Sequence, residues 1–136
     1  MPTRIYVDTS AAAKLFIAER ESPALRQWLS SQPQPRLISS ALLHVELVRV
    51  LSLARPAAIP AAERFLAETV DIAEITPPVL ADAVRMPPPR LRTLDAIHLA
   101  TAFDLGPVID VVLSYDKLLA ASARDAGLET AHPGAA

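Results

Sequence analysis

The chain has 136 residues, of which 51% are hydrophobic, 21% are charged and only 4% are aromatic, and its formal net charge is -2. This length suits one domain, and a core built mainly from aliphatic side chains favours helices packed on a sheet, so we expect a single α/β domain. The absence of cysteine excludes disulfides, thiolate zinc sites and a cysteine nucleophile. No apolar run approaches the roughly 20 residues that a membrane span needs, and the first residues lack the pattern of a secretion signal. We therefore expect a soluble cytoplasmic protein.

Short apolar runs alternate with segments of helical periodicity along the whole chain. The first run, residues 4–8, predicts a buried strand, and Thr9 and Ser10 can cap a helix over residues 11–17. The remaining expected elements, in chain order, are helix 22–31, strand 37–39, helix 42–54, a helix after Pro60, strand 70–75, a helix from Pro77 to Met86, helix 93–105, strand 108–113, a helix between Asp116 and Gly127, and strand 128–131. This alternation predicts a three-layer α/β/α domain with a mainly parallel central sheet.

Four acidic residues, Asp8, Glu46, Asp95 and Asp116, lie within or beside these apolar segments, and we call them the acidic quartet. Asp8 ends one predicted strand and Asp116 comes shortly after another. Asp95 lies in the first turn of a predicted helix, and Glu46 lies in the middle of the helix over 42–54. That helix is aliphatic on nearly every face, which predicts burial almost all round. Because ligands of parallel sheets bind at the carboxyl ends of the strands, we expect the four acids to gather at that edge.

Each acid also has an ordinary structural explanation. Asp8 and Asp116 are suited to cap helices, and the dipole of a helix would favour Asp95. Glu46 has neither explanation in mid-helix, although Arg49 three residues later can pair with it. These explanations stay open for each acid taken alone, but they do not account for four acids at one edge.

Four neighbouring carboxylates repel one another, and a divalent cation would remove that repulsion. Without cysteine, and without paired histidines at ligand spacing, their oxygen atoms fit Mg²⁺ or Mn²⁺ better than Zn²⁺. Such a cation can polarise a phosphate and activate a bound water, which predicts hydrolysis of phosphodiester bonds. Setting the quartet aside leaves 11 acids against 13 Lys and Arg, so the rest of the chain is mildly basic and can attract phosphates.

Four segments together resemble a known family. They are Tyr6-Val7-Asp8-Thr9-Ser10-Ala11, Glu46 within residues 41–49, Leu94-Asp95-Ala96-Ile97-His98-Leu99-Ala100, and Ser114-Tyr115-Asp116 with the helix that follows. In their order and spacing the chain resembles a PIN-domain ribonuclease, and more narrowly the VapC-type toxin of bacterial toxin-antitoxin pairs. The resemblance implies a PIN-like nuclease domain over residues 1–131 and a short C-terminal tail over 132–136.

The resemblance also implies a function and a set of partners. The acidic quartet would hold Mg²⁺ or Mn²⁺, and a metal-activated water would attack a phosphodiester bond of RNA, which is endoribonuclease activity. The expected partners are a second copy in a homodimer and a cognate VapB-like antitoxin whose tail blocks the site. Ser10 and Ser114 are expected to support the acids, although Ser10 also suits a helix cap and Ser114 stands where many relatives carry Thr.

Basic residues near these segments are candidates for contacts with RNA phosphates. They are Lys14, Arg90, Arg92 and Lys117, of which we favour Arg92. His98, three residues after Asp95, is more typical of a packed or hydrogen-bonded structural histidine, so we do not place it in the catalytic set.

Other functions fit the sequence less well. A phosphate-signalling receiver would need an adjacent acidic pair where Val7-Asp8 stands, and a dehalogenase-like phosphatase would need a second aspartate at Ser10. The chain has no glycine-rich segment that can cradle the phosphates of a nucleotide. The alternative that remains is a catalytically silent PIN-fold protein that serves for interaction or RNA binding.

Overall fold

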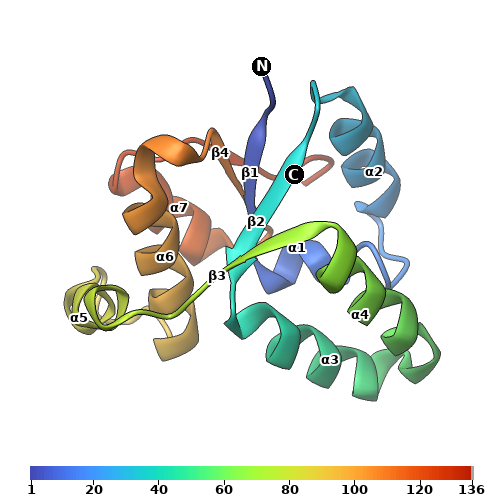
Figure 1. Cartoon of the computed structure of the whole chain (residues 1–136), viewed down its shortest axis with the longest axis horizontal. Coiled ribbons are helices and arrows are strands. Elements are labelled where there is room, and N and C mark those ends of the chain that lie inside the picture. The colour runs from blue at the N-terminus through green and yellow to red at the C-terminus, as the bar shows by residue number, and fades with distance from the viewer. Residues whose placement is uncertain (136) are drawn as a thin grey trace.

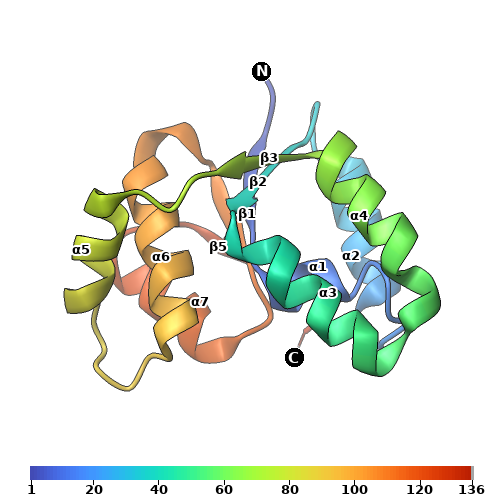
Figure 2. The ribbon, with the colours of Figure 1, turned by 60° about the horizontal axis from the view of Figure 1, so that its bottom comes forward.

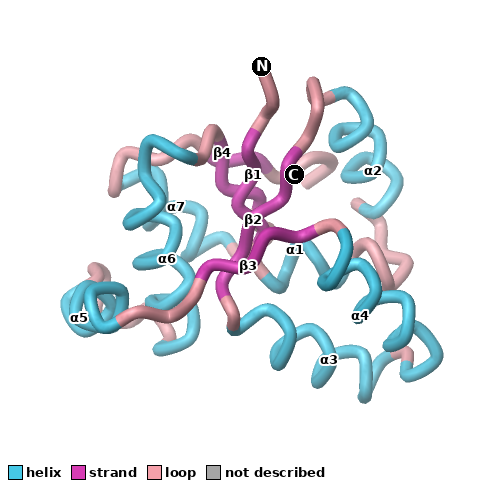
Figure 3. Tube along the Cα trace, in the orientation of Figure 1, coloured by secondary structure: helices cyan, strands magenta, loops and turns pink. Residues whose placement is uncertain are grey.

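The structure, a computed structural model, describes residues 1–135 and centres on a parallel five-stranded sheet in the order β3-β2-β1-β4-β5 (Figures 1 and 3). The strands are β1 (Arg4–Val7), β2 (Arg36–Ser40), β3 (Val70–Ala73), β4 (Val111–Leu113) and β5 (Thr130–Ala131). In the middle of the sheet, Ile5 lies beside Leu37 of β2 on one side and Val111 of β4 on the other. A central parallel strand is covered on both faces, which explains why β1 is a continuous apolar run. The expectation of a mainly parallel sheet is confirmed.

Helices cover both faces of this sheet, which makes the three-layer architecture expected from the sequence. The helices are α1 (Thr9–Ala13), α2 (Ser22–Ser31), α3 (Leu42–Ala54), α4 (Ile59–Glu68), α5 (Pro77–Arg85), α6 (Thr93–Leu105) and α7 (Lys117–Asp125), with short 3-10 turns at Pro56–Ala58 and Gly106–Val108. Figures 1 and 2 show α1 to α4 on one side of the strands and α5 to α7 on the other. Among the described residues, none of these helices combines the length and the apolar character needed to cross a membrane.

Two sets of side chains from β1 fill the two sides of the core. Ile5 and Val7 belong to a buried cluster with Leu25, Leu43 and Leu47 from the first group of helices. Tyr6 points to the other side, where a second cluster includes Ala102 of α6 and Val112 of β4. The alternation of neighbouring strand residues between two faces accounts for this division.

The ends of several elements differ from the sequence-based expectations. Strand β1 ends at Val7, and Asp8 caps α1, so Thr9 and Ser10 lie inside the first turn of that helix instead of before it. Helix α1 also ends at Ala13 rather than at residue 17. A 3-10 turn occupies Gly106–Val108, so β4 begins only at Val111. Helices 22–31, 42–54 and 93–105 have the predicted bounds.

The prediction that α3 is buried almost all round is wrong. Leu43, Leu47 and Leu51 are fully buried, whereas Val45 is 59% and Leu53 is 92% exposed. Helix α3 lies at the outside of the molecule, where only one of its faces meets the other elements (Figure 2). Its aliphatic composition therefore does not correspond to burial within the described chain.

The segment after β5 folds back onto the domain. The hydroxyl group of Tyr115 donates a hydrogen bond of 2.8 Å to the carbonyl oxygen of Pro133. Of the C-terminal tail that we expected over residues 132–136, Ala136 lies outside the described residues.

Candidate active site

Asp8 lies at the carboxyl end of the central strand, where β1 turns into α1. Its side chain caps that helix, because Oδ1 accepts a hydrogen bond of 3.0 Å from the backbone N–H of Ala11. The residue is only 3% exposed, and this burial raises the pKa of its carboxyl group even though neighbouring hydroxyl and N–H groups lower it. The helix-capping explanation for Asp8 is thus confirmed, and it does not exclude a further role at this edge.

Ser10 and Ser114, the two expected supporting residues, join Asp8 to the next strand–helix turn. Ser10 donates a hydrogen bond of 2.7 Å to Oδ1 of Asp8, and Ser114 donates one of 2.5 Å to Oδ2. The Ser10 hydroxyl also accepts from the backbone N–H of Tyr115, and the Ser114 hydroxyl accepts from that of Asp116. These bonds hold the β1–α1 turn and the β4–α7 turn in one arrangement.

Glu46 reaches the same region from α3. Its Oε1 accepts hydrogen bonds from Oγ1 of Thr9, at 2.8 Å, and from Nε2 of His98, at 2.6 Å. Burial acts to raise the pKa of Glu46, but the hydrogen bond and charge of His98 together with the Thr9 hydroxyl bring it below its ordinary value. The pairing with Arg49 that we considered from the sequence is not among the ion pairs of the described residues, because Glu46 is bound by His98 instead.

Asp95 and Asp116 complete the acidic quartet. Asp116 caps α7 and accepts a hydrogen bond of 2.9 Å from the backbone N–H of Leu119. Asp95 lies in the first turn of α6, as expected. Its pKa is raised by partial burial and, next in size, by the negative charge of Asp116, with smaller contributions of the same sign from Asp8 and Glu46. Asp116, Asp8 and Glu46 therefore lie close enough to Asp95 for their negative charges to raise its pKa.

A divalent cation fits the chemistry of this group, although the side chains do not form a coordination shell. All four donors are carboxylates at one edge of the sheet, and hard cations such as Mg²⁺ and Mn²⁺ prefer oxygen ligands. The charge of a cation would offset the repulsion that raises the pKa of Asp95. Within residues 1–135, however, no three or more histidine and acidic side chains are arranged as a metal-binding group.

The four acids lie within the part of the chain that matches a known protein family. The family model of the PIN domain matches residues 5–125. The ribonuclease VapC35 of Mycobacterium tuberculosis is 41% identical to this chain over 134 residues, covering 97% of the chain and 98% of VapC35. The chain belongs to the PIN-domain family and, within it, to the VapC ribonucleases.

Solved structures agree with this membership at the level of the fold. The crystal structure of M. tuberculosis VapC20, a toxin that cleaves the sarcin-ricin loop, has a TM-score of 0.73 and 23% identity, and the match covers 95% of this chain and 99% of VapC20. VapBC2 from Rickettsia felis, bound to a DNA fragment from its promoter, has a TM-score of 0.67 and 8% identity, with 95% of this chain and 98% of that chain covered. At these identities the likeness confirms the PIN-like α/β/α fold.

His98 and Thr9, which we did not expect at the site, connect the acidic quartet of this VapC-family chain to the core. The Nδ1 atom of His98 lies 2.7 Å from the hydroxyl oxygen of Tyr6, and His98 is 1% exposed. Thr9, which we expected outside the helix as a cap, donates to Glu46 instead. The description of His98 as a hydrogen-bonded structural histidine is confirmed, and its partner is one of the four acids. The spacing of Asp95 and His98 on one helix was the only available sequence signal.

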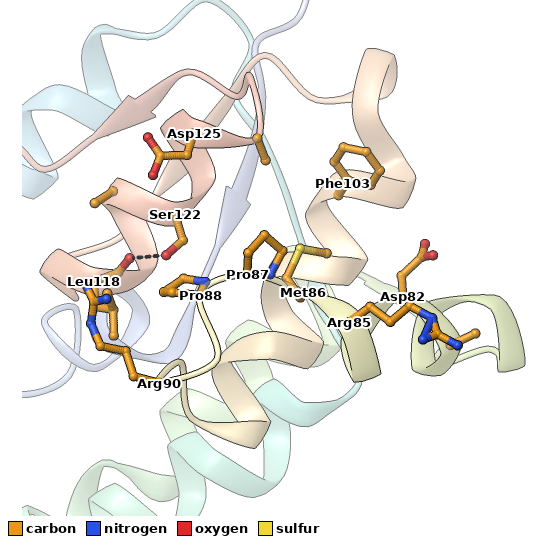
Figure 4. Close-up of a pocket in the computed structure, with 13 residues that line it drawn as sticks. Asp82, Arg85, Met86, Pro87, Pro88, Arg90, Phe103, Leu118, Ser122 and Asp125 are labelled. Atoms are coloured by element: carbon orange, nitrogen blue, oxygen red, sulfur yellow. Dashed lines mark hydrogen bonds between the residues drawn. The ribbon is translucent and has the colours of Figure 1, made fainter.

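The basic residues considered as RNA contacts have different surroundings. Lys14 is nearly buried, lies 3.2 Å from Glu19 and 3.1 Å from Glu21, and is therefore already paired. Arg92 is exposed directly before α6, the helix that carries Asp95. Arg90 lines a cavity of about 670 Å³ between α5, α6 and α7, next to Pro88 and Leu118 (Figure 4). None of the acidic quartet lines that cavity.

Proposed function

We propose that this VapC-family protein is an endoribonuclease that uses Mg²⁺ or Mn²⁺, bound by the acidic quartet, to hydrolyse phosphodiester bonds of RNA. The observation that supports this most directly is the buried carboxylate of Asp8, held by two serine hydroxyls at the edge where the other three acids also lie. When bound, the cation would stabilise charge on the phosphate and lower the pKa of a bound water. The identity with VapC35 along nearly the whole chain supports the same activity.

The residues of this chain would have distinct tasks in that reaction. Ser10 and Ser114 donate hydrogen bonds to the two carboxylate oxygens of Asp8, and these bonds fix the orientation of the carboxylate. Thr9 and His98 both bind Oε1 of Glu46, which leaves Oε2 outside these two hydrogen bonds. Asp95 and Asp116 would supply the remaining oxygen ligands. The hydrogen bonds therefore orient two of the acids before any ligand binds, which reduces reorganisation during the reaction.

The test of this function compares the purified wild type with Asp8→Asn on a mixed RNA pool, in Mn²⁺, in Mg²⁺ and with a chelator. Asp104→Asn is the matched control, because Asp104 is an exposed aspartate on α6, the helix that carries Asp95. We expect cleavage by the wild type and the control only when metal is present, and none by Asp8→Asn. Sequencing the new 5′ ends would identify the cut sites. Cleavage that persists in Asp8→Asn or in chelator would contradict the proposal.

We further propose that the protein acts within a toxin-antitoxin pair, as a homodimer that binds a VapB-like antitoxin. Solved structures of this fold include a toxin-antitoxin complex from Klebsiella pneumoniae. Exposed aliphatic side chains on α3, Val45 and Leu53 among them, offer a surface that a partner can cover. Light scattering of the purified protein should give the mass of two chains. Co-purification with the product of a short adjacent gene should inhibit cleavage. A catalytically silent interaction protein would bind such a partner without cleaving RNA in its absence.

A further inference from the structure

A second, smaller cavity adjoins the acidic quartet on the side of α7. It has a volume of about 390 Å³ and lies between α7 and the segment that follows β5. Its lining residues are Ser114, Tyr115, Asp116, Lys117, Ala120, Arg124, His132 and Ala135. Asp116 is a member of the acidic quartet and Ser114 donates a hydrogen bond to Asp8, so the cavity lies directly beside the quartet.

The charged groups that line this cavity include two cations, Lys117 and Arg124, whereas the acidic quartet contains carboxylates alone. Lys117, Arg124 and His132 line the cavity, and Asp116 is the one acidic residue among its described lining residues. Lys117 and Arg124 are seven residues apart on α7, which corresponds to roughly 10 Å along a helix axis. Arg124 donates a hydrogen bond of 3.0 Å from its guanidinium group to Oγ1 of Thr130. An arginine has five N–H donors, so one such bond leaves donors for a ligand. The ammonium group of Lys117 and the guanidinium group of Arg124 thus lie beside the acidic quartet.

The wall of the cavity opposite α7 is fixed in place by specific contacts. Tyr115 donates its hydroxyl proton to the carbonyl oxygen of Pro133, and Lys14 lies 4.7 Å above the ring of Tyr115. Gly134 has a positive φ of 80°, and a Cβ atom added there would lie 2.7 Å from Cβ of Ala24 on α2. A residue with a side chain would therefore be strained and would push the segment away from α2. These contacts keep His132 and Ala135 at the cavity.

We propose that this cavity, lined by Lys117, Arg124 and His132, binds a backbone phosphate of the RNA strand adjacent to the phosphate that is cleaved. This inference rests on the proposed nuclease function and gives it a substrate subsite. The four carboxylates repel phosphates, and a metal ion held by them would serve the scissile group. The neighbouring phosphate needs its own cations, and guanidinium and ammonium groups are the usual ones.

The test measures binding of a short single-stranded RNA of random sequence to the full-length chain carrying Asp8→Asn, over a series of KCl concentrations at constant Mg²⁺. On single strands each lost phosphate contact reduces the slope of log K against log salt by about 0.7. We expect that reduction for the double variant Lys117→Ala with Arg124→Ala, because both cations serve the same phosphate, and a part of it for each single variant. Arg124→Lys should keep the wild-type slope. Arg64→Ala is the matched charge control, because Arg64 is an exposed arginine on α4, a helix that lies on the other side of the strands from α7 (Figure 1).

Each result of this experiment decides one question. Slopes of the Lys117 and Arg124 variants equal to that of Arg64→Ala would overturn the subsite, whatever the cleavage assay shows. Competition by inorganic phosphate without any change of the RNA slopes would identify a free-anion site and would also overturn it. Reduced slopes in a protein whose wild type cleaves no RNA would uphold phosphate binding while removing the nuclease function. Thermal unfolding of each variant shows that the fold is retained.

Discussion

The imidazole of His98 joins Glu46 to the buried core, because its Nε2 atom lies 2.6 Å from Oε1 of Glu46 and its Nδ1 atom lies 2.7 Å from the hydroxyl of Tyr6. Each nitrogen of the buried ring therefore has one hydrogen-bond partner, the carboxylate of Glu46 at Nε2 and the hydroxyl of Tyr6 at Nδ1. The position of a candidate metal-binding acid on α3 is thereby linked to the central strand and to α6. Substitution of Tyr6 or of Glu46, the two ends of this chain of hydrogen bonds, should therefore have a measurable effect on stability or on cleavage.

Tyr6→Phe should lower the free energy of unfolding by about 1 to 3 kcal/mol. The substitution keeps the ring but leaves Nδ1 of the buried His98 without its partner, and an unpaired buried polar atom costs about that much. Urea denaturation measures the loss. Tyr115→Phe is the control, because its half-buried hydroxyl donates to Pro133 near the surface and should cost less. An equal loss of unfolding free energy in the two variants would contradict a larger contribution from the buried bond between Tyr6 and His98.

Glu46→Gln should impair cleavage far more than folding. The amide oxygen of glutamine can still accept from Thr9 and His98, so we expect the free energy of unfolding to change by no more than about 1.5 kcal/mol. The lost negative charge should reduce the cleavage rate by about 100-fold or more, a usual cost for removing one electrostatic group at an active site. A variant that unfolds readily but still binds Mn²⁺ would instead make Glu46 a structural residue.

Much of the fold could be predicted from the sequence because local signals coincide with it. Proline residues, apolar periodicity and the alternation of strands with helices located α2, α3 and α6 with correct bounds. Short elements were less accurate, since β4 and β5 depend on pairing with their neighbours and carry few residues of their own. The same local signals located Asp8 and Asp116 at the starts of helices and Asp95 in a first helical turn.

The contacts that cross between elements were not predictable. Nothing near Glu46 in the sequence indicates His98, which lies 52 residues later, and the neighbouring Arg49 was the more obvious partner. The burial of α3 was also misjudged, because its apolar composition does not tell whether a given face meets the core or a partner. Leu47 and Leu53 show the difference within one helix.

These two leucines give a direct comparison. Leu47→Ala should lower the free energy of unfolding by about 2 to 5 kcal/mol, because it opens a cavity in the largest buried cluster. Leu53→Ala, at a side chain that is 92% exposed, should change it by no more than about 0.5 kcal/mol. Chemical denaturation at low protein concentration measures both values. A large loss for Leu53→Ala that grows with protein concentration would show that α3 packs against another copy.

Divalent metal should stabilise the folded protein. A ligand that binds only the native state adds about 2.7 kcal/mol when its concentration reaches 100 times its dissociation constant. Thermal unfolding during titration with Mn²⁺ or Mg²⁺ should therefore show a rising midpoint, and Asp116→Asn should reduce the rise. The exposed Asp104→Asn on α6 should retain it. A midpoint that stays constant in the wild type would count against a metal site in the acidic quartet.

Asp95→Asn should stabilise the metal-free protein, increasingly so as the pH rises. Burial and the negative charge of Asp116 raise the pKa of Asp95 in the native state above its ordinary 3.8. The native carboxyl group therefore holds its proton to higher pH than the unfolded one does, so its ionisation lowers stability between these two pKa values. Below pH 3.8 the variant and the wild type should differ little, and above the raised pKa the gain should be constant. Denaturation with chelator across this pH range tests the effect, and a gain that shrinks with rising pH would contradict it.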